Sequence, residues 1–213
     1  MKPRVAIFIH QPKCSVQSGN GIMHALESDF NFKIFTRHRL ERDFFQDVDM
    51  IAIPGGLGDA DTYGYLLREN QARIRDYTDA GGRYLGICMG AYWAGKEYLD
   101  ILTGLDTVQY ITRPRTDTRR PHAKAISVDW SGQPERMFFY DGCAITGRGK
   151  LDVIATYVNG DAMAGYQGRI GLIGCHPESE PHWYNSYSWM KPHWHQGRHH
   201  ELLNNFAKEL MER

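Results

Sequence analysis

Short apolar runs alternate with amphipathic stretches over the first hundred residues. Four of these runs have the length and composition of buried β-strands, and they are residues 5–9, 32–36, 49–53 and 84–87. The stretches between them carry apolar side chains on one side and predict helices over residues 21–28, 40–46 and 66–80. Because strands that alternate with helices are joined by right-handed crossovers, this order predicts a parallel sheet.

Beyond residue 100 the pattern changes to short β-like segments with little helix between them. These segments are residues 108–112, 123–128, 136–140, 153–158 and 169–174. They predict an antiparallel extension on one side of the parallel core. A final helix is expected where Leu202, Phe206 and Leu210 form one apolar stripe.

Length and composition fit one α/β domain that spans residues 1–213. The 25 Lys and Arg residues balance the 25 Asp and Glu residues, so no long-range attraction to nucleic acid or to an anionic membrane is expected. No apolar run approaches the length of a membrane span, and we expect a cytoplasmic protein. The four cysteines show no CxxC spacing, which favours free thiols over a disulfide frame or a zinc site.

Cys88 lies where the chain turns from a predicted strand into a predicted helix. Gly86 and Gly90 flank it at two residues on either side, the spacing of a nucleophile elbow. A helix N-terminus favours thiolate over thiol, so Cys88 is our candidate nucleophile. The alternative is a small buried cysteine in a glycine-rich turn.

His176 and Glu178 follow the last predicted core strand. Residues two apart in extended chain point the same way, so the carboxylate of Glu178 can reach one ring nitrogen of His176. A base held in one tautomer by a third group is what a nucleophilic thiol requires. By itself, His-x-Glu also fits a solvated loop pair; the combination with an elbow cysteine makes it a candidate triad.

Gly55 and Gly56 follow the third predicted strand. A tetrahedral intermediate needs two preorganised N–H donors; Met89, the residue after the candidate nucleophile, could supply one and the Gly-Gly turn the other. No Gly-Lys-Ser/Thr continuation follows, which excludes a phosphate-binding loop.

Three motifs, IAIPGG at residues 51–56, YLGICMGAY at 84–92 and GCHPE at 174–178, resemble class I glutamine amidotransferases. Within that class they are most similar to the amidotransferase-like domain of biotin-protein ligases. The resemblance implies a flavodoxin-like three-layer α/β/α sandwich with a mainly parallel sheet, and a Cys88, His176 and Glu178 triad. It also implies an oxyanion hole at the Gly56 and Met89 N–H groups. We expect Gly55, Gly56 and Tyr92 to bind substrate.

The implied activity is hydrolysis of a carboxamide through a cysteine thioester, with glutamine as the expected substrate and ammonia passed to a separate synthetase chain. No cofactor is expected. Two alternatives remain: a cysteine peptidase or small-amide hydrolase of the same superfamily, and a non-catalytic regulatory or binding module.

Two segments stand outside these motifs. The basic stretch 113–124 has no interleaved aromatic residues, which favours a solvated loop over a nucleic-acid site. The histidines of residues 181–200 lack a committed carboxylate or cysteine partner in their spacing, so no metal site is expected from them. The aromatic residues of the same segment predict a lid or an interface.

Overall fold

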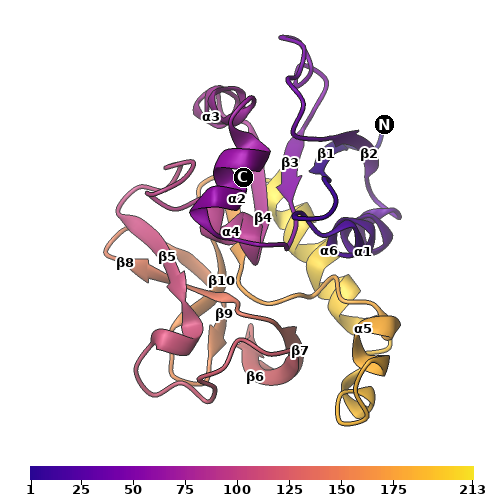
Figure 1. The fold of residues 1–213 in the computed structure, drawn as a ribbon, viewed down its shortest axis with the longest axis vertical. Helices are drawn as coiled ribbons and strands as arrows, with labels where there is room; N and C mark the ends of the chain where they lie inside the picture. Colours follow the sequence, from indigo (N-terminus) through magenta and orange to yellow (C-terminus); the bar gives the residue numbers. More distant parts are fainter.

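A computed structural model describes all residues 1–213 and shows one continuous sheet with helices on both faces (Figure 1). Its strands run in the order β2-β1-β3-β4-β11-β10-β9-β6-β7, while β5 and β8 pair beside β10. The pairs from β2 to β11 are parallel, and those from β11 to β7 are antiparallel. The predicted parallel core with an antiparallel extension is therefore confirmed.

The parallel strands are short, and all but the edge strand β2, in which only Phe35 is buried, are almost wholly buried. They are β1 (Arg4–Phe8), β2 (Asn31–Phe35), β3 (Met50–Ile53), β4 (Arg83–Ile87) and β11 (Ile170–Ile173). The antiparallel part consists of β5 (Leu105–Gln109), β6 (Lys124–Trp130), β7 (Gln133–Phe139), β8 (Cys143–Gly147), β9 (Asp152–Tyr157) and β10 (Ala162–Gln167). The sequence pattern did not predict β8 or β10.

Alternate residues of the core strands point to opposite faces, and each face is covered by its own helices. Val5 and Ile7 of β1 pack with α1 (Val16–Leu26) and α6 (Arg198–Met211). Ala6 and Phe8 pack on the other face with α2 (Ala60–Leu67), α3 (Gln71–Asp79) and α4 (Met89–Trp93). Figure 1 shows α1 and α6 beside each other, away from α2 and α4. The predicted three-layer α/β/α arrangement is confirmed.

Three helix predictions need correction. Helix α1 begins at Val16 rather than at residue 21, because the Ser15 side chain accepts a hydrogen bond from the Ser18 N–H and caps it. The predicted helix 66–80 is two helices, α2 and α3, interrupted at residues 68–70. The predicted helix 40–46 is a series of turns.

The buried Asn70 explains why the chain between β2 and β3 is irregular. Its amide nitrogen donates to the carbonyl of His38 at 2.9 Å, and its oxygen accepts from the Leu40 N–H at 3.0 Å. These bonds satisfy backbone groups that a helix would otherwise pair. Phe44 and Phe45 still pack against Phe35 and are partly buried.

Two short elements follow β11 and precede α6. They are helix α5 (Pro181–Asn185) and the 3₁₀ turn η2 (Lys191–His193), and a further 3₁₀ turn, η1 (Tyr110–Thr112), follows β5. No helix of the chain combines the length and the apolar character needed to cross a lipid bilayer.

Close packing at the strand ends depends on glycine, which an alanine substitution can test. A Cβ atom at Gly90 would collide with the Ile53 carbonyl oxygen, so we expect Gly90→Ala to lower the free energy of unfolding by about 1–3 kcal/mol. Gly64→Ala in α2 is the control, since no atom lies within 4 Å of its added Cβ and alanine is the better helix former. Urea unfolding should separate the two variants, and equal stability of Gly90→Ala and wild type would contradict the packing described here.

Candidate active site

Three adjacent parallel strands deliver the candidate site residues to one edge of the sheet. Strand β4 lies between β3 and β11, and all three run in the same direction. Gly55 and Gly56 follow β3, Cys88 follows β4, and His176 and Glu178 follow β11. Segments more than a hundred residues apart thus meet at the carboxyl ends of neighbouring strands, where open α/β sheets form their sites.

Cys88 has the strained backbone that a nucleophile elbow requires. Its φ of 49° and ψ of −102° place a non-glycine residue in a rarely occupied region, at the N-cap of α4. The turn is held by the Cys88 N–H, which donates to the Ile173 carbonyl at 2.9 Å. A Cβ at Gly86 would lie 2.5 Å from the Gly90 carbonyl oxygen, so the flanking glycines are required by space.

His176 and Glu178 form a buried hydrogen-bonded pair. Nδ1 of the imidazole lies 2.8 Å from Oε1 of the carboxylate, and the two residues are 5% and 0% exposed. This contact leaves Nε2 as the ring nitrogen available to the sulfur of Cys88, which lies beside the imidazole. The rings of Phe138 and Trp183 contact the imidazole edge-to-face and restrict its orientation.

The charges around His176 favour its protonated form. Burial opposes a positive charge, but the Glu178 carboxylate and the Cys88 sulfur more than offset it and raise the pKa of His176 to about 10. The imidazole is therefore cationic at neutral pH. A cationic imidazole beside the sulfur favours a nucleophilic thiolate and can act as an acid.

Ser18 joins this network, although the sequence pattern placed it before the helix predicted over residues 21–28. Its buried hydroxyl donates to Oε1 of Glu178 at 2.6 Å and accepts the Gly55 N–H at 2.9 Å. The serine thus connects the carboxylate with the glycine turn after β3. Only the capped start of α1 brings Ser18 inward, and a helix predicted from residue 21 could not reveal that.

The N–H groups of Gly56 and Met89 remain free for a ligand. Gly56 lies in a bridge with Cys14 in which the flanking residues make the hydrogen bonds, and its own N–H donates none within the chain. Met89 is the first residue of α4, so its N–H has no acceptor within the helix. A Cβ at Gly56 would lie 2.7 Å from the Met89 sulfur, so the two residues are close neighbours.

Two cavities meet at Cys88. The first, about 490 Å³, is lined by His176, Ser18 and Trp183, and the second, about 400 Å³, by Met89 and Tyr92. The residues that line both are Gly56, Leu57, Cys88 and Tyr140. The sulfur of Cys88 lies 3.6 Å from the Tyr140 carbonyl oxygen, at the junction of the two cavities.

The second cavity has an acidic wall. Asp59 and Asp141 line it together with Gln109, whose amide donates to Oδ2 of Asp141 at 3.0 Å. Partial burial raises the pKa of Asp141, and its Oδ1 has no hydrogen-bond partner. The Tyr92 hydroxyl donates to the Asp141 carbonyl at 3.1 Å, which fixes the phenol in the wall of this cavity.

Comparisons with known proteins bear on the family and the fold. Residues 12–100 match the family model described as the N-terminal part of biotin-protein ligase. The structure is similar to a glutamine amidotransferase of Thermotoga maritima, at 16% identity and a TM-score of 0.67 over 100% of this chain and 98% of that one. The chain therefore has the fold of the glutamine amidotransferases. No curated protein matches its sequence.

Two further solved structures share this fold. PurLQS from Thermotoga maritima is similar at 15% identity, with a TM-score of 0.64 over 98% of this chain and 100% of that one. A β-galactosidase of Marinomonas ef1 is similar at 12% identity and a TM-score of 0.53, over 99% of this chain and 29% of that one. Identities this low show a shared fold and leave the chemistry to the site.

The basic segment 113–124 and the aromatic segment 181–200 both lie on the described structure. In the basic segment 113–124, Arg113 forms a two-point ion pair with Asp161, and Lys124 donates to Thr118 and to the Arg120 carbonyl. These contacts use the charges within the fold. The Trp183 ring lines the first cavity, while Trp189 is 62% exposed.

The pKa of His176 predicts how stability depends on pH. Since the folded-state pKa lies above the unfolded value of 6.5, protonation of His176 stabilises the fold fully below pH 6.5, and this contribution is lost as the pH rises through about 10. We expect the difference in unfolding free energy between wild type and His176→Asn to shrink over that range. Urea titrations at pH 6, 8 and 10 measure it; a difference that grows with pH would contradict the assigned charge.

Proposed function

We propose that this protein hydrolyses a side-chain carboxamide, that of glutamine, through a thioester on Cys88. The observation that carries the proposal is the buried His176–Glu178 pair beside the sulfur of a strained elbow cysteine. A thiolate beside an imidazolium supplies both the nucleophile and the acid that acyl transfer needs. The amidotransferase-like fold supports the same class of reaction.

The geometry suggests how the first half of the reaction proceeds. The Cys88 thiolate attacks the amide carbon, and the oxygen develops negative charge between the N–H groups of Gly56 and Met89. The imidazolium of His176 then gives its proton to the departing nitrogen, the C–N bond breaks, and ammonia leaves a thioester. Glu178 and Ser18 are positioning residues, since they hold the imidazole and the glycine turn without touching the reacting atoms.

The second half uses His176 as a base. Neutral imidazole takes a proton from water while the water oxygen attacks the thioester, and the bond between sulfur and carbon breaks. The products are glutamate and the thiolate, with the proton back on His176. Because the same nitrogen donates and later accepts the proton, each turnover restores the starting charges.

The two cavities support an assignment of substrate parts. Met89 lines only the second cavity and His176 only the first, so we assign the acyl group to the second cavity and the leaving ammonia to the first. The acidic residues Asp59 and Asp141 in the wall of the second cavity suit an ammonium or N–H group on the acyl side, such as the α-ammonium of glutamine. A volume of about 400 Å³ is in the range of small-molecule sites.

A separate synthetase chain is the proposed recipient of the ammonia. The stacked rings of Tyr187 and Trp189 lie 4.8 Å apart and are 42% and 62% exposed, and Tyr187 lines the first cavity. Exposed aromatic side chains of this kind are typical of protein interfaces. They lie at the cavity assigned to the leaving ammonia.

Replacing Cys88 tests the reaction directly. Cys88→Ala should lower ammonia release from glutamine by at least roughly 10⁴-fold, because the nucleophile is lost. Cys175→Ala is the matched control, since it removes a buried thiol that the mechanism does not use. Circular dichroism verifies that both variants fold, and retained turnover in folded Cys88→Ala would contradict the mechanism.

A substrate panel separates the proposed activity from its alternatives. Glutamine, asparagine and short peptides are offered to wild type, and an acyl group on Cys88 is sought by mass spectrometry. An acyl-enzyme formed from glutamine supports the glutaminase. Acylation by a peptide or another amide alone would favour the peptidase or small-amide hydrolase, and acylation by none would favour a binding module.

A further inference from the structure

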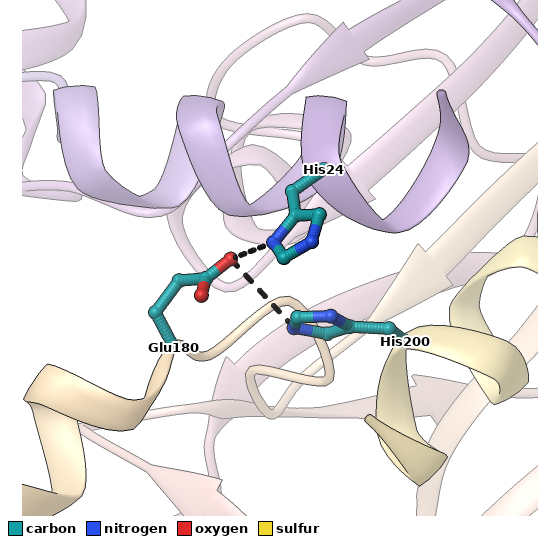
Figure 2. A group of neighbouring side chains, drawn as sticks. All are labelled: His24, Glu180 and His200. Atoms are coloured by element: carbon teal, nitrogen blue, oxygen red, sulfur yellow. Dashed lines mark hydrogen bonds and ion pairs between the residues drawn. The ribbon is translucent and has the colours of Figure 1, made fainter. Parts of the chain in front are cut away.

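Three potential metal ligands converge on the face of the molecule that carries α1 and α6. His24 comes from α1, Glu180 precedes α5, and His200 comes from α6 (Figure 2). Nδ1 of His24 lies 2.7 Å from Oε1 of Glu180, and Nε2 of His200 lies 3.9 Å from the same oxygen. All three ligand atoms are within 4.8 Å of one another.

The ligand types and their spacing fit a zinc-class cation. Two imidazoles and one carboxylate are a common zinc set, whereas magnesium and calcium prefer oxygen ligands alone. Zinc bonds of about 2.0–2.1 Å in a tetrahedron place ligand atoms roughly 3.3 Å apart. The separations of His24, Glu180 and His200 bracket that value, so small side-chain rotations suffice to close the site.

Metal binding would leave no backbone group unpaired. Nε2 of His200 lies 3.0 Å from the Ser179 carbonyl oxygen, a contact that it gives up when its lone pair binds a metal. Nε2 of His195 lies 3.1 Å from the same oxygen and continues to satisfy it.

We propose that His24, Glu180 and His200 bind one zinc-class divalent cation. The side chains of Glu180 and His200 are largely buried, whereas that of His24 is 59% exposed, so the fourth coordination position opens to water. The cation would tie together α1, the start of α5 and α6. Spacing within 181–200 could not predict this site, since two of the three ligands lie outside that segment.

The position of the site connects it with the His176–Glu178 pair. Glu180 is two residues beyond Glu178, and helix α1 carries both His24 and Ser18, which donates to the Glu178 carboxylate. A cation that joins α1 to Glu180 would therefore hold the two elements that position the carboxylate. The three ligands act as structural and positioning residues and do not reach the cavities at Cys88.

Zinc titration of the full, tag-free and chelator-treated chain tests the proposal. We expect wild type and Cys88→Ala each to bind one Zn²⁺ in calorimetry, with a rise in melting temperature. His24→Ala and Glu180→Gln should bind at least roughly tenfold more weakly, because one of three protein ligands is lost. His193→Ala, which replaces a histidine outside the cluster, should bind like wild type.

The outcomes separate the proposed site from other zinc binding. Co²⁺ should give visible absorption bands in wild type that disappear in His200→Ala. Unchanged Zn²⁺ affinity in folded His24→Ala, or loss of binding only in Cys88→Ala, would overturn the proposal, the latter by assigning the metal to the thiol. No saturable binding by wild type would overturn it too. None of these measurements involves turnover, so the test of metal binding is independent of whether the protein hydrolyses an amide.

Discussion

The charge on a buried imidazole is the constraint on which the candidate site depends. His176 is almost fully removed from water, and an isolated cation there would be strongly disfavoured. Glu178 on one ring nitrogen and the sulfur of Cys88 beside the ring make the charge favourable. An imidazolium in this position holds a proton within reach of a leaving group, which acyl transfer by cysteine requires.

The fold supplies that geometry through strand order and glycine. Adjacent placement of β3, β4 and β11 brings three turns to one edge, and each turn contributes one part of the site. The turns approach so closely that a Cβ at Gly55 would lie 2.6 Å from Cε1 of His176. The contacts that fix the backbone at this edge of the sheet also fix the imidazole, so the same contacts determine both the stability of the fold and the geometry of the site.

The sequence predicted the parallel core and its turns well because these depend on local patterns. Buried strands, flanking glycines and the short His-Pro-Glu segment can each be recognised from a pattern of a few consecutive residues. Ser18 and Asn70 left none, since each acts through a side chain that reaches backbone or carboxylate groups far away in sequence. Strand β10 was missed because its sequence contains no β-branched residue, a composition that sheet pairing overrides, and β8 was missed because it is short and includes alanine and glycine.

The most direct measurement is the protonation of His176 itself. Nuclear magnetic resonance of the chain labelled with ¹⁵N-histidine reports the charge of each imidazole as the pH is raised. The account predicts that His176 of wild type stays protonated at neutral pH and titrates near 10, and that in Cys88→Ala it titrates lower because the anionic sulfur is gone. A His176 that is neutral at pH 7 in wild type, or that titrates identically in both proteins, would contradict the thiolate–imidazolium pair.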